Sequence, residues 1–449
     1  MSVDYRATVF LPQTGFPMKA ELPKREPDLL ARWQAIDLYG RMRKQSEGRE
    51  KFILHDGPPY ANGHLHIGHA LNKILKDLVV RSQQMSGKNA VYVPGWDCHG
   101  LPIEWKIEEK YRAEKKNKDE VPIVEFRQEC RAFAAEWIDI QRAEFKRLGG
   151  IGDWDHPYET MDFKAEAQIA REIGKFVMNG GLYRGAKPVM WSVVEKTALA
   201  EAEVEYHDHT SPTIFVRFPI HKGAAALAGV SAVIWTTTPW TMPGNRAIAY
   251  GPEIDYVVMQ VTQVGEGSLA KPGEKILVAE ALAESVAAST GIQAWTKAAS
   301  LKGTELAGAV AYHPFHGQGY DFNVPLLPGA HVTTEAGTGL VHTAPGHGED
   351  DWELGTAYGI EVPQTVDADG SYYAHVPLFA GARVYTPYGK PGDANPRVIQ
   401  ALIDAGALLA QSTVLHSYPH SWRSKAPLIF RNTPQWFISM STNGLRDTA

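Results

Sequence analysis

The sequence is short of cysteine: its 449 residues include only Cys98 and Cys130. A chain of this length with so few cysteines has no disulfide framework, which is typical of proteins in a reducing cytoplasm. No apolar run approaches the ~20 residues that a membrane-spanning helix needs. Residues 1–16 mix charges and prolines without an apolar core, so they do not form a secretory signal. We therefore expect a cytoplasmic protein with no membrane partner.

An excess of positive charge is also lacking. The formal net charge is −6 and the sequence pI is about 6.3. The chain therefore has no overall attraction for nucleic acid, and RNA binding would need local basic patches or a part of the protein outside these residues. With 44% hydrophobic and 21% charged residues, the composition is that of a globular protein. Its length predicts about two to four domains.

The first part of the sequence predicts an α/β fold. Residues 51–55 form a short apolar run typical of a buried strand, and a loop rich in Gly and Pro follows at 57–63. Apolar residues then keep a helical period over 67–79, and 91–93 form the next strand-like run. A strand, a helix and a strand in this order make a βαβ unit, which predicts a parallel, Rossmann-like sheet.

The pattern changes near residue 187 to short β-rich runs with frequent turns, most clearly over 213–387. The later run 434–438 has the pattern of a buried strand and is a candidate for the first sheet. We therefore predict a β-rich domain inserted into the Rossmann-like domain. The predicted parts are an N-terminal extension (1–44), the first part of the Rossmann-like domain (45–185), the insertion (186–425, core about 200–400) and the return (426–449).

The tetrapeptide His66-Ile67-Gly68-His69 stands where the first loop passes into the predicted helix. A helix N-terminus attracts phosphate through its free N–H groups and partial positive charge. Two imidazoles about one turn apart can donate hydrogen bonds to a polyphosphate, and Gly68 leaves room for a nucleotide against the backbone. The alternative is a pair of histidines that cap the helix or bind a metal.

The run 55–77 around this tetrapeptide resembles the first motif of class I aminoacyl-tRNA synthetases. Its GPPYANG lead-in resembles the isoleucyl-tRNA synthetases within that family, and the run 95–104 (GWDCHGLPIE) resembles the same family. The resemblance implies that His66, Gly68 and His69 serve catalysis with ATP and Mg²⁺. It also implies that L-isoleucine and its tRNA are partners, and that the protein is a monomer.

The same resemblance implies that Pro58 and Asp97 line the isoleucine site, with Trp436 as an aromatic wall. The chemistry agrees for Asp97, because an α-ammonium group needs a carboxylate partner and ligands of open α/β sheets bind at the carboxyl edge of the strands. For Trp436, taken alone, packing in a core is the alternative.

Two further segments, 235–247 (WTTTPWTMPGNRA) and 337–351 (GTGLVHTAPGHGEDD), resemble the editing insertion of the isoleucine, valine and leucine enzymes. The resemblance implies that Asp351 holds the α-ammonium of the misattached amino acid and that His342 borders its side chain. The residues implied to hold the terminal ribose of the tRNA and a water are Thr236, Thr237, Thr238, Thr241 and Asn245. No nucleophile elbow is present, so direct attack by water is expected. The alternative for the threonine run is an ordinary end of a strand, with no role in binding.

An editing site answers a physical need. Isoleucine and valine differ by one methylene, which a hydrophobic pocket discriminates only weakly, and the isoleucine enzymes are themselves the standard example of this limit and of the second, hydrolytic sieve.

The sequence departs from the family in two places. Many members carry a Cys-x-x-Cys zinc knuckle after Trp191, but here Ser192, Glu195 and Ser421 take cysteine positions, so we expect no zinc. The lysine-bearing KMSKS loop is not found in the 449 residues. We therefore expect an N-terminal fragment, with the editing site complete and the synthetic site incomplete.

Two other functions compete with this hypothesis. A free-standing deacylase would have no use for the tetrapeptide at 66–69. A different HxGH nucleotidyltransferase would have no use for the threonine run, and the acidic net charge argues against a simple nucleic-acid-binding module.

Overall fold

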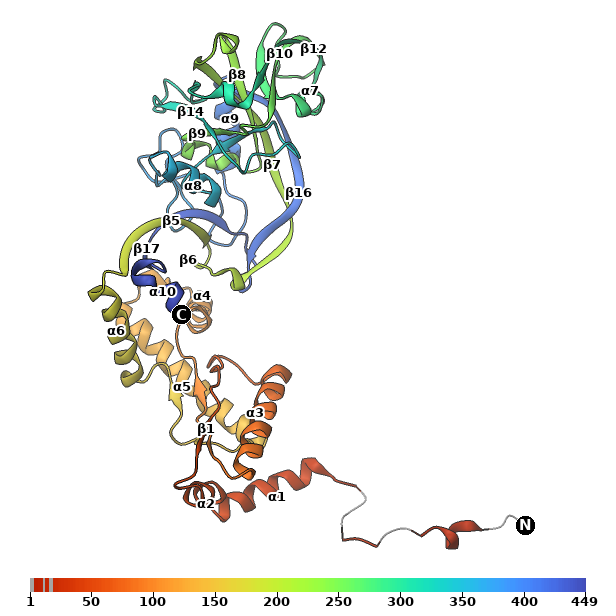
Figure 1. The fold of residues 1–449 in the computed structure, drawn as a ribbon, viewed down its shortest axis with the longest axis vertical. Coiled ribbons are helices and arrows are strands. Elements are labelled where there is room, and N and C mark those ends of the chain that lie inside the picture. The colour runs from red at the N-terminus through yellow and green to blue at the C-terminus, as the bar shows by residue number, and fades with distance from the viewer. Residues whose placement is uncertain (1–3, 11–12, 16–18) are drawn as a thin grey trace. The chain divides into compact units, whose positions relative to one another are not determined.

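The computed structural model describes residues 4–10, 13–15 and 19–449. The remaining residues belong to the predicted N-terminal extension, and that part of the prediction lies outside the described residues. The chain divides into two compact units, Met1–Gly180 and Gly181–Ala449. In Figure 1 the first unit runs from red to olive yellow and the second from there to blue. Each unit is described by itself.

The first unit alternates short strands with longer helices, as predicted. Its elements are η1 (Tyr5–Thr8), α1 (Leu22–Ala35), α2 (Leu38–Gln45), β1 (Lys51–Ile53), α3 (Ile67–Met85), β2 (Asn89–Val91), β3 (Gly95–Trp96), α4 (Leu101–Ala113), η2 (Lys118–Glu120), α5 (Ile123–Arg147), β4 (Tyr158–Glu159) and α6 (Phe163–Met178). Strands β1 and β2 pair in parallel, as do β3 and β4. The α/β class and the parallel βαβ unit are therefore confirmed, although β2 begins and ends two residues before the predicted run.

The core of the first unit is built by side chains of its strands and of α4 and α5. Trp96, Ile103, Ile138 and Phe145 are among its fully buried side chains. The indole N–H of Trp96 donates to Oε1 of Gln141 at 2.9 Å, so the one polar atom of this ring has a partner. Since Trp96 comes just before Asp97, this packing fixes the strand end that carries the carboxylate.

The second unit is dominated by strands. They are β5 (Leu182–Ser192), β6 (Thr197–Ala198), β7 (Val204–Lys222), β8 (Val230–Thr236), β9 (Ala247–Tyr250), β10 (Asp255–Val264), β11 (Lys275–Ala279), β12 (Ile292–Lys302), β13 (Val310–Tyr312), β14 (Asn323–Pro328), β15 (Leu340–Thr343), β16 (Leu408–Ser421) and β17 (Ile429–Ile438). The helices are η3 (Glu201–Glu203), η4 (Ala225–Leu227), η5 (Pro239–Gly244), η6 (Glu280–Leu282), α7 (Ala283–Thr290), η7 (Gly303–Leu306), α8 (Glu349–Ala357), α9 (Ala394–Asp404), η8 (Thr442–Gly444) and α10 (Leu445–Thr448).

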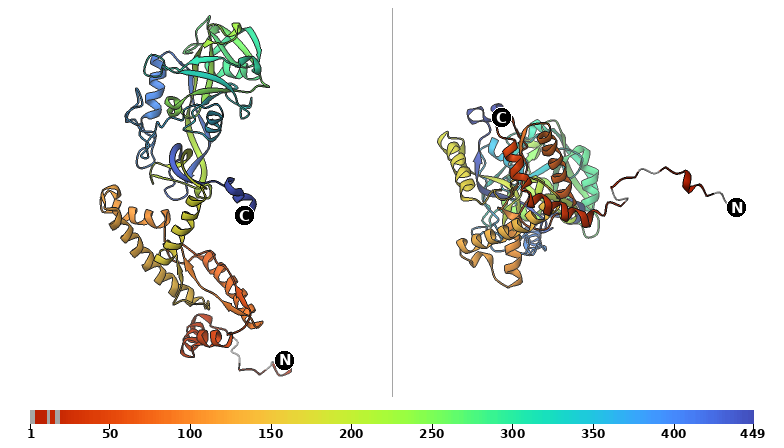
Figure 2. Two further views of the ribbon diagram at one scale, coloured as in Figure 1. Left: turned by 60° about the vertical axis from the view of Figure 1, so that its left-hand side comes forward. Right: turned by 90° about the horizontal axis from the view of Figure 1, so that it is seen from below.

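Ten of these strands form one mixed sheet in the order β12-β10-β11-β8-β7-β13-β14-β9-β15, with β16 added beside β7. Strands β7 and β16 run side by side along a long antiparallel ladder, which the views in Figures 1 and 2 agree in showing. The sheet places β8 and β15, which carry the threonine run and His342, in the same unit. The pattern change near residue 187 is therefore a real change of architecture.

The run 434–438 pairs differently from the expectation. It is the end of β17, which pairs antiparallel with β5 in a separate three-stranded sheet of the second unit, with Trp436 opposite Arg184. Only the first half of β17 is buried, and Trp436 is 69% exposed. Its apolar sequence did not identify its partner, because β5 offers an equally long complementary edge in the same unit.

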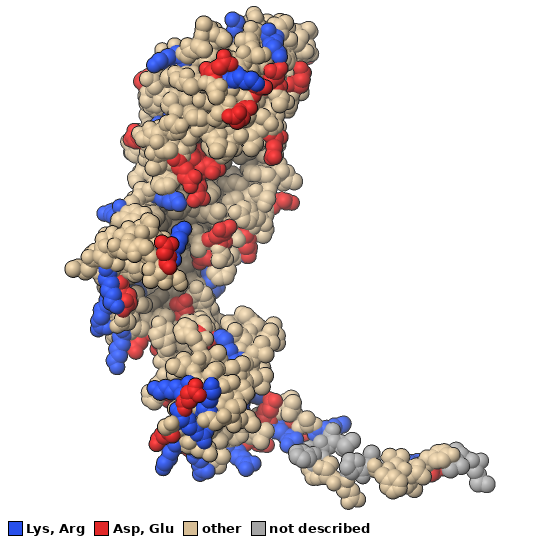
Figure 3. All heavy atoms as spheres, viewed as in Figure 1, with Lys and Arg blue, Asp and Glu red and all other residues tan. Residues whose placement is uncertain are grey.

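No helix among the described residues is long and apolar enough to cross a membrane. The face of the molecule drawn in Figure 3 carries acidic and basic side chains interspersed, in keeping with the slightly negative net charge.

Candidate functional site

The HxGH tetrapeptide forms the N-terminal cap of α3. His66 is the N-cap residue, and its Nδ1 accepts a hydrogen bond from the backbone N–H of Gly68 at 3.1 Å. In return, the backbone N–H of His66 donates to Nδ1 of His69 at 3.3 Å. The two rings stack with centroids 3.8 Å apart. The histidines thus make a reciprocal capping box, so they begin the helix as predicted and cap it as the alternative interpretation expected.

This cap fixes the tautomer of both rings. Because each Nδ1 accepts a backbone N–H, a neutral imidazole at either position carries its proton on Nε2. Burial, the neighbouring His66 and Lys73 all lower the pKa of His69, so the neutral form is favoured there. A Cβ at Gly68 would lie 2.9 Å from Cε1 of His66. The glycine therefore makes room for the ring that caps the helix, and both Nε2–H groups stay available as donors.

The loop that carries Pro58 lies beside the strand end that carries Asp97. The backbone N–H of Asp97 donates to the carbonyl of Pro59 at 2.8 Å, and the N–H of Ala61 donates to the carbonyl of Asp97 at 3.0 Å. A Cβ at Gly95 would lie 3.4 Å from that of Pro58. The structure thus brings Pro58 and Asp97 together at the carboxyl end of β3. Trp436 belongs to the second unit, so its relation to this pair stays a prediction.

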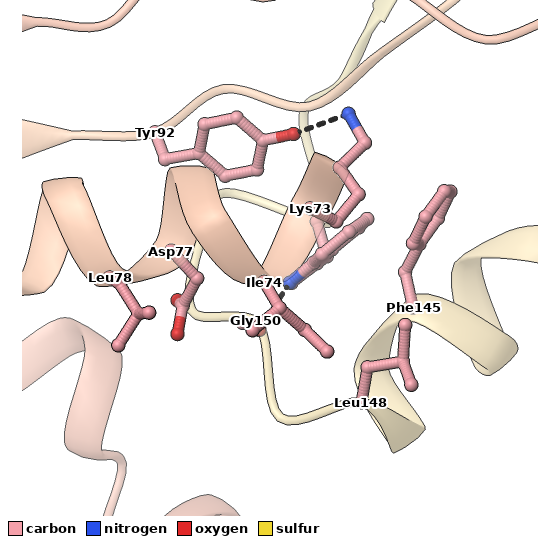
Figure 4. Close-up of a pocket in the computed structure, with 9 residues that line it drawn as sticks. Lys73, Ile74, Asp77, Leu78, Tyr92, Phe145, Leu148 and Gly150 are labelled. Carbon is pink, nitrogen blue, oxygen red and sulfur yellow. Dashed lines mark hydrogen bonds between the residues drawn. The ribbon is translucent and has the colours of Figure 1, made fainter. Parts of the chain in front are cut away.

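Sequence reasoning missed a polar cluster beneath α3. Asp56, which follows β1, accepts hydrogen bonds from Lys73 and Lys76 of α3 and from the Tyr92 hydroxyl. Figure 4 shows Lys73 reaching the hydroxyl of Tyr92, over a distance of 2.7 Å. The signal in the sequence was a pair of lysines on the face of α3 toward β1, but their shared partner lies 17 and 20 residues away.

In the second unit, the threonine run lies where β8 passes into η5. The backbone N–H of Thr238 donates to Oγ1 of Thr236 at 3.1 Å, and the hydroxyl oxygens of these residues are 3.2 Å apart. The Thr241 hydroxyl donates to the carbonyl of Thr238 at 2.9 Å. Thr237, half-buried, takes no part in these bonds. Three of the four threonines thus form one hydroxyl cluster.

His342 connects this cluster to Asn245. Its Nε2 lies 2.9 Å from Oγ1 of Thr241, and its Nδ1 lies 2.8 Å from Nδ2 of Asn245. Nδ2 of Asn245 also donates to the carbonyl of Ala247 at 2.9 Å, so the amide nitrogen faces both acceptors. His342 therefore accepts on Nδ1 and donates from Nε2 to the Thr241 hydroxyl. Burial lowers the pKa of His342 to about 3, which keeps the ring neutral.

One acceptor in this network has no partner among the described residues: Oδ1 of Asn245, in a side chain that is fully buried. A buried amide oxygen without a hydrogen bond is costly, and such groups often face a water or a ligand.

Asp351 lies in the first turn of α8 and is half-buried. Its Oδ2 accepts the backbone N–H of Ala344 at 2.9 Å, and no ion pair of this carboxylate is found in the part of the chain described. Burial and the nearby Asp350 raise its pKa to about 6, against the effect of the Ala344 N–H. Asp351 reaches the His342 strand through Ala344 and makes no hydrogen bond to the threonines. A cationic group bound beside Asp351 would therefore stabilise the ionised carboxylate.

Three side chains that the sequence did not reveal hold η5 in place. The hydroxyl of Tyr372 donates to the carbonyl of Trp240, whose backbone N–H donates to Oδ1 of Asn395 at 2.9 Å. The buried His313 contacts the carbonyl of Met242 through Nε2 at 3.1 Å. These partners are 71 to 155 residues away from η5 in the sequence, so no local pattern could have identified them.

At the cysteine-like positions, the structure shows a hydrogen-bonded cluster. Glu195 is 3% exposed, and its carboxylate accepts the hydroxyl of Ser421 at 2.8 Å and the backbone N–H of Ser424 at 3.1 Å. The hydroxyl oxygen of Ser192 accepts the backbone N–H of Glu195 at 3.2 Å. A carboxylate and hydroxyls thus join the two turns where thiolates would be the zinc ligands.

Comparison with known proteins identifies the class. The family model for tRNA synthetases class I (I, L, M and V) matches residues 28–449, so the chain belongs to this family. Within it, the chain is similar to enzymes named isoleucine--tRNA ligase. That of Bradyrhizobium diazoefficiens is 58% identical over 462 residues, covering 98% of this chain and 46% of the relative. That of Rhodopseudomonas palustris is 57% identical over 460 residues, covering 99% of this chain and 46% of the relative.

The chain therefore spans about half the length of the curated relatives it matches. Among solved structures, a ternary complex of the Agrobacterium radiobacter LeuRS with tRNA and LeuAMS is 17% identical to it. That match has a TM-score of 0.35 and covers 92% of this chain and 49% of that chain.

Proposed function

We propose that the chain is part of an isoleucine--tRNA ligase that activates isoleucine with ATP and Mg²⁺ and transfers it to its tRNA. The observation that carries this proposal is the capping box of α3, in which Nδ1 of His66 and Nδ1 of His69 accept backbone N–H groups and leave the Nε2–H groups available as donors. These donors lie at the start of a 19-residue helix, whose N-terminus favours anions. We further propose a cytoplasmic monomer without zinc.

The reaction that this site fits is adenylyl transfer. The isoleucine carboxylate attacks the α-phosphorus of ATP, and pyrophosphate leaves with the electron pair of the broken P–O bond. His66 and His69 donate hydrogen bonds to phosphate oxygens as negative charge builds on them, and Asp97 binds the α-ammonium of isoleucine. Positioning and electrostatic stabilisation supply most of the acceleration in such transfers.

ATP binding to residues 1–449 tests this proposal. We expect measurable affinity by calorimetry and a loss of ~10-fold or more in the His66→Ala and His69→Ala variants, since a lost hydrogen bond to a charged group costs about 1.5–3 kcal/mol. The matched control is His156→Ala, an 83% exposed imidazole paired with Asp153. Equal affinity in all four proteins would refute the role of the tetrapeptide. Isoleucine-dependent ATP–pyrophosphate exchange should be very slow, because these residues include no KMSKS loop.

We also propose a hydrolytic editing site for valine misattached to the tRNA. The observation that favours it is a polar network inside a β-rich unit: the hydroxyl cluster, the neutral His342 and the unpartnered Oδ1 of Asn245. In this proposal the hydroxyls and Asn245 hold the terminal ribose and a water. The water oxygen bonds to the ester carbonyl carbon, the ester bond to the ribose oxygen breaks, and a proton ends on that oxygen. Asp351 binds the α-ammonium.

Deacylation of valyl-tRNA by residues 1–449 tests the editing proposal. High substrate concentration and low salt are needed, because phosphate contacts dominate affinity for tRNA. We expect hydrolysis by the parent chain and a steep loss in Asp351→Ala. If the parent shows no deacylation, or if Asp351→Ala hydrolyses valyl-tRNA equally fast, the site is misassigned.

A further inference from the structure

The carboxylate of Asp56 connects three segments of the first unit. Asp56 follows β1 and precedes Pro58 by two residues, and its side chain is only 5% exposed. Its carboxylate takes the ammonium groups of Lys73 and Lys76 on separate oxygens, and it accepts the Tyr92 hydroxyl at 2.7 Å. One carboxylate thus joins a strand end, a helix and the segment after β2.

The chemistry of this cluster keeps Asp56 ionised. Burial alone would raise its pKa, but the hydrogen bonds from Lys73, Lys76 and Tyr92 together hold the pKa below its ordinary value. The three donors also fix the orientation of the Asp56 carboxylate relative to α3, because charge-assisted hydrogen bonds are short and directional. The cluster therefore acts as a polar clamp between α3 and the end of β1.

The clamp is close to the capping box. Lys73 lies four residues after His69, which is one helical turn along the same face of α3. Holding Lys73 and Lys76 at Asp56 therefore fixes both the rotation of α3 about its axis and its position along that axis. Because Asp56 also stands immediately before the loop that carries Pro58, the clamp sets the place of His69 relative to that loop.

Few side chains of α3 are buried: among its residues these are Val80 and Gln84. Ile74 and Leu78 of α3 are 44% and 58% exposed, and they border a pocket of about 70 Å³ that Lys73 and Phe145 also line (Figure 4). Close-packed side chains normally fix a helix in place, and a void has no partner atoms on one side. Beside this pocket, the hydrogen bonds of Asp56 to Lys73 and Lys76 hold α3 in position.

We propose that Asp56 is a positioning residue for the nucleotide site, acting through Lys73 and Lys76 on the helix start that carries His66 and His69. This inference rests on the proposed binding of ATP by the tetrapeptide. For a substitution that removes the charge of Asp56, it predicts a change in ATP affinity opposite to the one expected from charge alone. Removing a negative charge near a polyphosphate site should tighten ATP binding, whereas loss of positioning should weaken it.

The test compares Asp56→Asn with Asp139→Asn in residues 1–449. Asp139 is 75% exposed on α5, so its substitution makes the same change of charge in the same unit without touching the clamp. We expect Asp56→Asn to weaken ATP binding by ~10-fold, the size of one lost charge-assisted hydrogen bond, and Asp139→Asn to leave it unchanged. Tyr92→Phe keeps the ring and removes one donor to Asp56, so a smaller loss, ~3-fold, is expected there.

A second measurement does not depend on ATP. Nitrogen-15 spectra of the histidine side chains near pH 8 report the tautomer, and His69 should be Nε2–H in the parent and a mixture in Asp56→Asn. Unchanged or tighter ATP binding together with an unchanged His69 tautomer overturns the inference. If the parent does not bind ATP, the proposed function fails, and the tautomer alone decides whether Asp56 positions the helix start. If Asp56→Asn does not fold, Tyr92→Phe decides by both measurements.

Discussion

Asp351→Asn should stabilise the protein while it impairs editing. In the folded chain the pKa of Asp351 is raised from 3.8 to about 6, because partial burial and the nearby Asp350 both disfavour the charged carboxylate. Between these two values the folded chain binds more protons than the unfolded chain, so stability falls as the pH rises through this window. The full cost is present above pH ~6 and is lost below pH ~4.

The shift corresponds to about 3 kcal/mol near pH 7.5 and to roughly half of that near pH 5. Asparagine has no charge to desolvate and keeps an oxygen that accepts the Ala344 N–H, so Asp351→Asn should recover up to these amounts. The gain should be larger at the higher pH. Deacylation of valyl-tRNA should fall ~100-fold or more, because removing one partner of a buried charge pair costs about 3–5 kcal/mol.

Urea unfolding at both pH values measures the stability, and a deacylation assay on the same samples measures the activity. Glu353→Gln is the matched control, since it removes a charge from an exposed position of the same helix. The reasoning is refuted if Asp351→Asn is less stable than the parent near pH 7.5, because the carboxylate would then have a favourable partner in the folded chain. Greater stability with unchanged deacylation would remove Asp351 from the editing site.

Three further substitutions test other parts of the structure. Thr238→Arg should abolish valyl-tRNA deacylation by filling the space beside the Thr236 and Thr241 hydroxyls; hydrolysis at the parent rate would exclude that space as the binding site. Gly68→Ala should weaken ATP binding ~10-fold at nearly unchanged melting temperature, because the new Cβ displaces the His66 ring while alanine favours the helix by up to ~1 kcal/mol; calorimetry and thermal melts would contradict this if affinity held. Glu195→Ala should cost about 2–4 kcal/mol by leaving the Ser421 hydroxyl and Ser424 N–H unpaired, whereas a zinc chelator should not change the melting temperature of the parent.

Local sequence patterns sufficed for the elements that are made by neighbouring residues. The helical period after the Gly-rich loop predicted α3, and the order of strand, helix and strand predicted the parallel pairing of β1 with β2. The HxGH tetrapeptide was placed at a helix start because the Gly- and Pro-rich loop ends there and the helical period begins. The capping box of His66 and His69 joins residues two or three apart at that start. The roles of these residues in binding remain proposals.

Contacts between distant segments could not be obtained in this way. The bond between Thr241 and His342 spans 101 residues, and the tautomer of His342 depends on Asn245 as well. The sequence resemblance grouped these residues by analogy, but it contained no information on which nitrogen faces which partner. The partner of β17 was misjudged for the same reason, since a strand pattern describes burial along one strand and not the edge it pairs with.

By itself, the sequence determined the α/β class of the first unit, the change to strands near residue 187 and the helix start at His66. These features depend on periodicity, turn residues and caps, which act over a few residues. Only the tertiary structure decided that Asp56 joins Lys73 to Lys76, that Glu195 is buried against Ser421, and that Asp351 accepts the Ala344 N–H and forms no ion pair within the described residues. Charge and hydrogen-bond partners are set by proximity in space, and the chain folds back over long loops before those groups meet.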